Sequence, residues 1–348
     1  MASIKSTSYT IHIGNDCFEK LNSFLKKGSY SKYVIICDEN SFEYCLPSLL
    51  FHCPLLTEAE IIELESGEEY KTLDTCANAW GALTDIKADK KSLIVNLGGG
   101  VISDLGGFVA STFKRGIHFI NIPTTLLSMV DASVGGKTGI DFNGIKNHIG
   151  TLTEPRGIFI NPDFLETLSK RQIKNGYAEI IKIALIADAE FWKELKKGKE
   201  IYSEKIITKA IELKNNIVKK DLHENDLRKS LNFGHSIGHA LESALIFLKK
   251  DILHGEAIVA GMIMESHIAL SQKRITKKEC DEIVNYITSV YPKIKITKDI
   301  KALIFEYIKH DKKNEGENLC FSLPKNIGQY ELTCTLSQPE IEQALAAY

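Results

Sequence analysis

Residues 92–97 (SLIVNL) are mostly apolar and predict a buried strand, and three glycines at positions 98–100 follow it directly. The next residues, 101–113 (VISDLGGFVASTF), have helical spacing, so the segment predicts a strand, a glycine turn and a helix. This order places backbone N–H groups and a helix N-terminus where a phosphate can approach closely. It is not the complete G-x-G-x-x-G fingerprint, and no acidic residue lies at the spacing that would hold a ribose. The glycines therefore indicate a phosphate-binding turn, with a purely structural tight turn as the alternative.

Further strand-like segments lie on both sides of this one in the sequence. Residues 33–37 (YVIIC) end at Asp38, residues 118–122 precede a Pro-Thr-Thr sequence, and residues 8–13 alternate in the manner of a strand. Continuous apolar runs are typical of strands buried on both faces of a parallel sheet. Strands that alternate with helices predict a sheet of Rossmann type. The polar, glycine-rich residues 131–150 predict a hairpin or an ordered loop.

From about residue 162 the pattern is helical almost to the end of the chain. We therefore predict an α/β Rossmann-like domain over residues 1–160 and an all-α domain over residues 161–348. A chain of 348 residues is long enough for two substantial cores.

The composition excludes several classes of protein. Lys plus Arg (43) and Asp plus Glu (45) nearly cancel to a net charge of -2, which argues against a nucleic-acid partner. Eight cysteines without a C-x-x-C pair predict reduced thiols and a cytoplasmic location. No apolar run approaches membrane-spanning length, and the N-terminal residues are too polar for a signal sequence. We expect a soluble protein with no membrane partner.

Three histidines stand close together in residues 231–256. His235 and His239 are four residues apart in a helical pattern, so their rings should project from one helix face. His254 follows in an LHGE turn, where Gly255 would allow backbone geometry that other residues resist. Two neutral imidazoles from separate elements plus one carboxylate make an open catalytic metal site of the zinc type. An isolated H-x-x-x-H is more often a pair of polar histidines on a half-exposed helix, so the neighbouring motifs decide.

Glu179 and Lys182 are three residues apart in an otherwise apolar helical segment, AEIIKIALIAD. A surface ion pair is one interpretation. The apolar flanks favour an interior or a cleft, where a buried glutamate needs a partner that a metal ion would supply. Arg228, on the approach to the histidine helix, is suited to gripping a carboxylate through two parallel hydrogen bonds.

Six segments occur in order along the chain: GGGVISD, RGIHFINIPTTLLSMVDASVGGKTGI, KNHIG, NGYAEIIK, RKSLNFGHSIGHALE and LHGEAIVAGM. Together they resemble the 3-dehydroquinate synthase family of the sugar phosphate cyclases, from about Asp38 to the DKKNEG segment at Asp311. The resemblance implies a dehydroquinate synthase-like fold, a place in the shikimate pathway, and NAD with a divalent metal, usually zinc, cobalt being the alternative. The implied reaction converts 3-deoxy-D-arabino-heptulosonate 7-phosphate to 3-dehydroquinate and phosphate. It proceeds by transient oxidation, phosphate elimination, re-reduction and intramolecular aldol closure.

The resemblance also assigns residues. The implied metal ligands are Glu179, His235 and His254, whereas His239 matches a substrate-side group. The implied cofactor contacts are Asp38, Glu68, Lys71, Gly99, Gly100, Val101, Ser103, Asp104, Thr124, Thr125, Lys137, Lys146, Phe164 and Thr167. The implied substrate contacts are Asp131, Lys137, Asn147, Lys182, Lys214, Arg228, Asn232, His239 and, of the Lys312-Lys313 pair, Lys312. Arg115 matches an arginine that the family supplies from a neighbouring subunit, which implies a homodimer.

Three positions depart from the family pattern: Ser103 and Ile145 replace glycines, and Ser169 replaces a proline. None removes a reactive group, so we expect them to tune binding.

Other functions remain open. Another sugar phosphate cyclase, such as a 2-deoxy-scyllo-inosose synthase, would act on a substrate without a carboxylate, which Arg228 argues against. A metal-dependent polyol dehydrogenase would release NADH and would not need a cluster of phosphate-holding side chains. A metal- or nucleotide-binding module that has lost catalysis would not need the reactive positions that this chain keeps.

Overall fold

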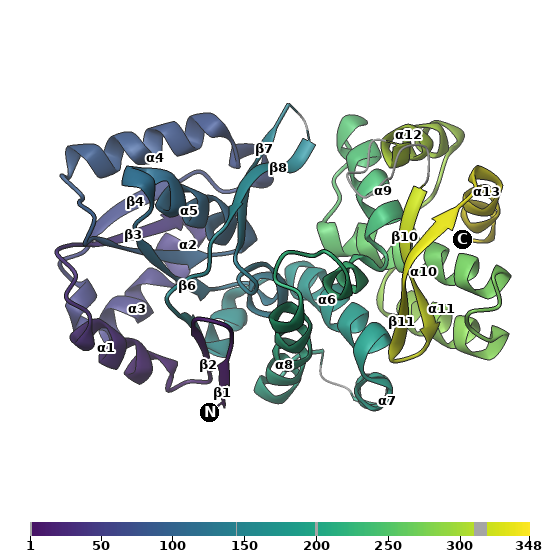
Figure 1. The fold of residues 1–348 in the computed structure, drawn as a ribbon, viewed down its shortest axis with the longest axis horizontal. Coiled ribbons are helices and arrows are strands. Elements are labelled where there is room, and N and C mark those ends of the chain that lie inside the picture. Colours follow the sequence, from purple (N-terminus) through teal and green to yellow (C-terminus); the bar gives the residue numbers. More distant parts are fainter. Residues whose placement is uncertain (1, 144, 199–200, 310–318) are drawn as a thin grey trace. The chain divides into compact units, whose positions relative to one another are not determined.

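The computed structural model describes residues 2–143, 145–198, 201–309 and 319–348. The chain separates into two compact units (Figure 1). The first contains the residues up to Ile173 together with Tyr202–Asn215, and the second contains Lys174–Ile201 and Asn216–Tyr348. Among the described residues, no helix is both long and apolar enough to cross a membrane.

A seven-stranded sheet forms the centre of the first unit, in the order β1-β2-β9-β6-β5-β3-β4 (Figure 1). Every neighbouring pair is parallel except β1 with β2. The strands are β1 (Ala2–Lys5), β2 (Thr10–Ile13), β3 (Tyr33–Asp38), β4 (Glu60–Leu64), β5 (Leu93–Gly98), β6 (His118–Pro123) and β9 (Ile158–Ile160). All six residues of β5 are buried. The parallel sheet predicted from the apolar runs is therefore confirmed.

Helices connect the strands of this sheet. They are α1 (Cys17–Lys27), α2 (Glu39–Tyr44), α3 (Leu46–His52), α4 (Leu73–Asp85) and α5 (Gly100–Thr112). The apolar sides of α4 and α5 share one core cluster with Val34 and Ile36 of β3 and Ile94 of β5. The alternate residues Ile35 and Cys37 are also fully buried, so β3 is covered on both faces. The start of helix α8 (Glu204–Lys220) belongs to the same unit.

The glycine-rich segment after β6 forms the predicted hairpin. A short π-helical turn over Ser128–Ala132 leads into β7 (Lys137–Phe142), which pairs antiparallel with β8 (Ile145–Leu152). A Cβ atom at Gly150 would lie 2.1 Å from the backbone oxygen of Thr138. Glycine is required there because the two strands approach too closely for a side chain.

The second unit is mostly helical. It holds α6 (Lys170–Ala187) from Lys174 onward, α7 (Ala189–Lys197), α9 (His235–Phe247), α10 (His254–Ser271), α11 (Lys277–Val290), α12 (Lys298–Lys309) and α13 (Gln338–Ala347). The mostly helical character agrees with the sequence prediction. The unit is not purely helical, because β10 (Leu319–Asn326) and β11 (Gln329–Leu336) pair as an antiparallel hairpin. The sequence did not predict β10, because it contains Pro324 and proline, which cannot donate a hydrogen bond to a neighbouring strand, argues against a strand.

Candidate active site

The N-terminus of α9 is held by a buried carboxylate of the neighbouring helix. Glu265 of α10 accepts the backbone N–H of Gly234 (2.6 Å) and that of Ile237 (3.1 Å). Gly234 precedes the helix with a φ of 79° and supplies no side-chain cap, so Glu265 satisfies the exposed N–H groups instead. A Cβ atom at Gly261 would lie 2.0 Å from the oxygen of Gly234. The two helices therefore meet at glycine, and His235 starts from a fixed position.

His254 is the first residue of α10 and does not lie in a separate turn. Gly255 has no positive φ, so the predicted reason for this glycine was wrong. A Cβ atom at Gly255 would lie 2.2 Å from the backbone oxygen of Asn175 in α6, and its N–H donates to Asn175 Oδ1 at 2.6 Å. The glycine lets α10 begin directly against α6. Glu179 lies one helical turn beyond Asn175 on α6.

The side chains of three helices converge at Glu179. Its Oε1 lies 3.6 Å from Nε2 of His235 and 3.6 Å from Nε2 of His254. Glu179 is 3% exposed, and its Oε1 has no hydrogen-bond partner among the described residues. Lys182, one turn further along α6, pairs with the other carboxylate oxygen. Burial opposes the charge of Glu179, but Lys182 and His254 outweigh it and lower the pKa of Glu179 to about 2. The carboxylate is therefore ionised at neutral pH.

The outer nitrogens of both histidine rings have acceptors. Nδ1 of His235 lies 3.1 Å from the backbone oxygen of Phe233, and Nδ1 of His254 lies 3.4 Å from Oε2 of Glu242. Because these partners accept, each Nδ1 donates, and in its neutral form each ring would offer the lone pair of Nε2 to a cation beside Glu179. Two imidazole nitrogens and one carboxylate oxygen are the donor set of an open zinc-type site, and the buried Oε1 needs a positively charged partner. These side chains fit a divalent cation.

His239 lies one turn after His235 on α9 and is exposed. Nitrogens of His235, His239 and His254 lie within 4.8 Å of one another, so these three rings form a second conceivable ligand set. The two sets share His235 and His254 and differ in whether Glu179 or His239 completes them.

The turn before α9 contains two predicted substrate contacts. Arg228 is 3% exposed, and its Nη1 donates to the backbone oxygen of Leu222 at 2.7 Å. The carboxylate of Asp221 accepts the backbone N–H groups of Asn225, Asp226 and Arg228. Asn232 donates to Oε1 of Glu224 at 2.7 Å. The turn is thus fixed by its own hydrogen bonds.

Three glutamates at this site were not singled out from the sequence. Glu242 stands seven residues after His235, on the same face of an apolar helix, and Glu265 stands alone in the apolar middle of α10. A carboxylate in an apolar helix was the signal for both. Glu224 lies in a polar turn, where acidic residues are common, so its sequence carried no signal.

Two predicted substrate contacts meet in the first unit. Lys214 of α8 is 6% exposed, and its Nζ donates to the backbone oxygen of Asp131 (2.5 Å) and to Oδ1 of the same residue (2.6 Å).

Predicted cofactor and substrate contacts also meet at Lys71. Its buried Nζ donates to Oδ2 of Asp104 (2.6 Å) and to Oδ1 of Asn147 (2.5 Å), and lies 3.8 Å from Glu68. Burial opposes the charge of Lys71, but Asp104 and Glu68 outweigh it and keep the pKa of Lys71 above its usual value. Lys146 lies 3.6 Å from the same Glu68. The hairpin residue Asn147 is therefore joined to the helix that follows the glycine turn.

Several of the remaining predicted cofactor contacts lie where the neighbouring parallel strands β3, β5 and β6 end. The N–H of Thr124 donates to the oxygen of Gly98 at 2.9 Å, beside the start of α5, and Asp38 caps α2 by accepting the N–H of Ser41. Phe164 is buried in the core against Phe18. Thr167, Lys137 and Arg115 are exposed. Lys312 lies outside the described residues.

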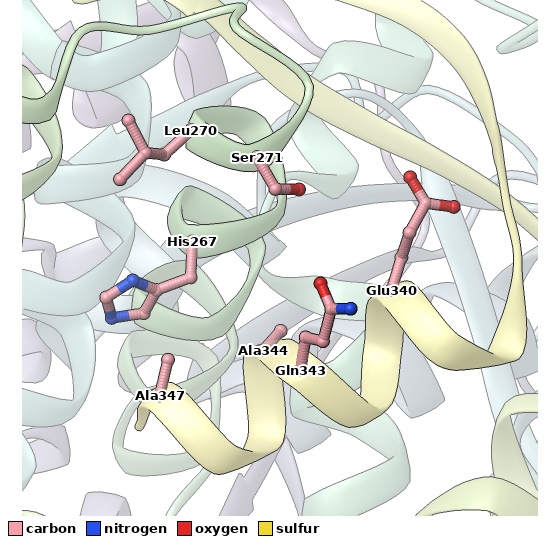
Figure 2. A pocket seen from close by; sticks show the side chains of 7 residues that line it. All are labelled: His267, Leu270, Ser271, Glu340, Gln343, Ala344 and Ala347. Carbon is pink, nitrogen blue, oxygen red and sulfur yellow. The ribbon is translucent and has the colours of Figure 1, made fainter.

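One separate pocket of about 210 Å³ lies between α10 and α13 (Figure 2). His267, Leu270 and Ser271 face Glu340, Gln343, Ala344 and Ala347 across it. His267 is thirteen residues further along α10 than His254, roughly 20 Å at the helical rise, so this pocket is not part of the histidine site.

Solved structures of sugar phosphate cyclases share the fold of this chain. A 2-deoxy-scyllo-inosose synthase, solved with carbaglucose-6-phosphate, NAD+ and Co2+, matches with a TM-score of 0.88 at 25% identity, over 99% of both chains. The 2-epi-5-epi-valiolone synthase from Streptomyces hygroscopicus, solved with NAD+ and Zn2+, matches with a TM-score of 0.84 at 26% identity, over 100% of this chain and 98% of the other. A probable glycerol dehydrogenase from Sinorhizobium meliloti, 14% identical with a TM-score of 0.67, shares the fold alone.

Sequence comparison narrows this class. The 3-dehydroquinate synthase N-terminal model matches residues 61–175, and the 3-dehydroquinate synthase C-terminal model matches residues 176–314. A 3-dehydroquinate synthase from Parabacteroides distasonis is 39% identical over 341 residues, covering 97% of this chain and 96% of the relative. One from Helicobacter pylori is 37% identical over 348 aligned residues, covering 98% and 97%. The chain belongs to the 3-dehydroquinate synthase family, so the resemblance inferred from the six motifs is confirmed.

Proposed function

We propose that this protein is a 3-dehydroquinate synthase that converts 3-deoxy-D-arabino-heptulosonate 7-phosphate to 3-dehydroquinate and phosphate, with NAD and a divalent metal. Its relatives carry this activity in their names over nearly the whole chain. The observation that carries the proposal is the buried Glu179 carboxylate, whose Oε1 lies 3.6 Å from Nε2 of both His235 and His254. A reaction that begins at a hydroxyl group needs such a cation site open to substrate oxygens.

We assign the metal to Glu179, His235 and His254, and not to the three histidines. Glu179 is buried and ionised, and Lys182 pairs with its Oε2, so a cation beside Oε1 would complete the pairing of this carboxylate, whereas the exposed His239 remains hydrated. His239 lies near the same nitrogens and is available on the substrate side. Substituting His254 with alanine should therefore lower metal content, and substituting His239 with alanine should not.

When bound, NAD would accept and return a hydride while the metal would polarise the reacting hydroxyl. The side chains provide the binding and orientation. Lys137 and Asn147 suit the substrate phosphate, because cationic and amide donors form strong hydrogen bonds with phosphate oxygens. Arg228 and Lys182 suit the substrate carboxylate. The later ring opening and aldol closure need mainly correct orientation, which fixed side chains such as Arg228 supply.

We further propose a homodimer in which Arg115 reaches the phosphate of the neighbouring subunit. Arg115 is exposed and, like Lys114 before it, has a positive φ, so a tight turn presents this residue at the surface of its unit.

A cytoplasmic location is also proposed. The seven cysteines whose side chains the structure describes are buried and none of them forms a disulfide, as suits a reducing compartment.

The experiment is to measure phosphate release from the heptulosonate phosphate while following NADH absorbance in the same sample. We expect phosphate release with no net accumulation of NADH. Accumulating NADH would indicate a polyol dehydrogenase. Phosphate release only from a sugar phosphate without a carboxylate would indicate a different cyclase.

A further inference from the structure

Glu242 is a buried charged group with no role in the function proposed above. It lies in α9 seven residues after His235, so two helical turns place both side chains on the same face. Only 2% of Glu242 is exposed. A buried carboxylate is costly unless it is paired, and the partner here is Nδ1 of His254 at 3.4 Å.

The ring of His254 is therefore bracketed by two buried carboxylates. Glu242 lies at its Nδ1, and Oε1 of Glu179 lies 3.6 Å from its Nε2. A hydrogen bond from Nδ1–H to Glu242 fixes which ring nitrogen carries the proton. It also fixes the rotation of the ring and makes Nε2 a better electron donor. At the corresponding nitrogen of His235 the acceptor is the neutral backbone oxygen of Phe233.

The charges in this region point the same way. A bound divalent cation and the buried Lys182 would together carry three positive charges. Glu179 alone would oppose them with one negative charge. Glu242 adds a second negative charge without occupying a coordination position. Its carboxylate therefore favours a cation at the site while leaving room for substrate oxygens.

We propose that Glu242 is the positioning residue of the metal site, which orients His254 and raises the affinity of the protein for its divalent metal. This inference rests on the metal site of the proposed function. It concerns the affinity for the metal and does not depend on which sugar phosphate the enzyme converts.

The test is a zinc competition titration against a chromogenic chelator, with wild type, Glu242→Gln and Glu306→Gln. Glu306→Gln removes an exposed carboxylate from α12 of the same unit and controls for net charge. We expect Glu242→Gln to weaken zinc binding about 10- to 100-fold, the usual effect of losing a carboxylate behind a ligating histidine. The control should match wild type. The visible spectrum of the Co2+ form should also change in Glu242→Gln, because the His254 ring would lose its fixed orientation.

A double-mutant cycle separates positioning from general electrostatics. In a His254→Ala background, Glu242→Gln should have little further effect on the residual zinc affinity, because Glu242 acts through that ring. An equal loss in both backgrounds would overturn the positioning role, and so would wild-type zinc affinity in a folded Glu242→Gln protein. If Glu242→Gln does not fold, Glu242→Asp takes its place, with an expected loss of about tenfold because the shorter side chain cannot reach Nδ1. Full zinc occupancy in His254→Ala alone would instead remove His254 from the ligand set of the proposed function, and with it the role of Glu242.

Discussion

Replacing Arg228 with lysine tests which class of sugar phosphate the site accepts. The arginine is 3% exposed, and its Nη1 donates to the oxygen of Leu222 at 2.7 Å, which holds the guanidinium group in place. Lysine keeps the charge but cannot present two parallel donors to a carboxylate. If Arg228 grips the substrate carboxylate, the variant should lose about 2–4 kcal/mol of transition-state stabilisation. That loss corresponds to roughly a 30- to 900-fold fall in kcat/KM.

The folded state should change much less. The variant loses the hydrogen bond to Leu222, about 1 kcal/mol of stability, while the backbone N–H at this position still donates to Asp221. Kinetics on the heptulosonate phosphate and melting temperature are measured on one preparation. Arg274→Lys is the matched control, because Arg274 lies in the same unit and pairs with Gln272 and Glu331 instead. A stable Arg228→Lys enzyme with wild-type kcat/KM would refute the carboxylate role and reopen the choice of substrate.

Three further predictions address the cofactor, the turn before α9 and the metal. Gly100→Val should weaken NAD binding strongly in calorimetry, because it adds a side chain at the glycine turn that we expect the cofactor to approach. The protein should still fold, because an added Cβ at Gly100 would lie 3.3 Å from the Cβ of Ala132, a contact that a small shift can relieve. Unchanged affinity would place NAD elsewhere. Asp221→Asn should cost about 1–2 kcal/mol of unfolding free energy at pH 7. Burial opposes the charge of Asp221, but three backbone N–H groups outweigh it and lower its pKa. Its contribution is therefore present above about pH 4, the unfolded pKa, and is lost as the pH falls through the lower folded value, so the stability curves of wild type and variant should converge in acid. His254→Ala should reduce bound metal in elemental analysis, whereas His239→Ala should retain it; loss of metal in both variants would favour the three-histidine ligand set.

The sequence predicted the central sheet well because burial on both faces leaves a continuous apolar run. Strand β3 carries that signature, β5 and β6 carry it with one buried asparagine each, and the glycines after β5 locate the start of α5. The hairpin of β10 and β11 was missed because β10 is interrupted by proline and surrounded by helical patterns. Local periodicity cannot reveal a strand whose partner and burial depend on distant helices.

At the histidine site, the sequence indicated the candidate metal and substrate residues, but it did not indicate the residues that hold them in place. His235, His239 and Glu179 belong to recognisable motifs. The need for glycine at position 255 arises from its contact with Asn175, eighty residues earlier. Glu242 and Glu265 look like isolated charges in apolar helices until the packing of α9 against α10 shows what each one holds. Pairings of this kind arise only in the folded chain.

The shared ammonium group of Lys71 has a consequence for binding thermodynamics. Asp104 and Asn147, predicted to contact cofactor and substrate respectively, both accept from this one nitrogen. A ligand that changes the bond on one side alters the donor available to the other, so the two affinities are linked. We expect phosphate to bind with a different affinity when NAD is present, and NAD to respond to phosphate by the same factor. In Lys71→Met, that reciprocal dependence should disappear.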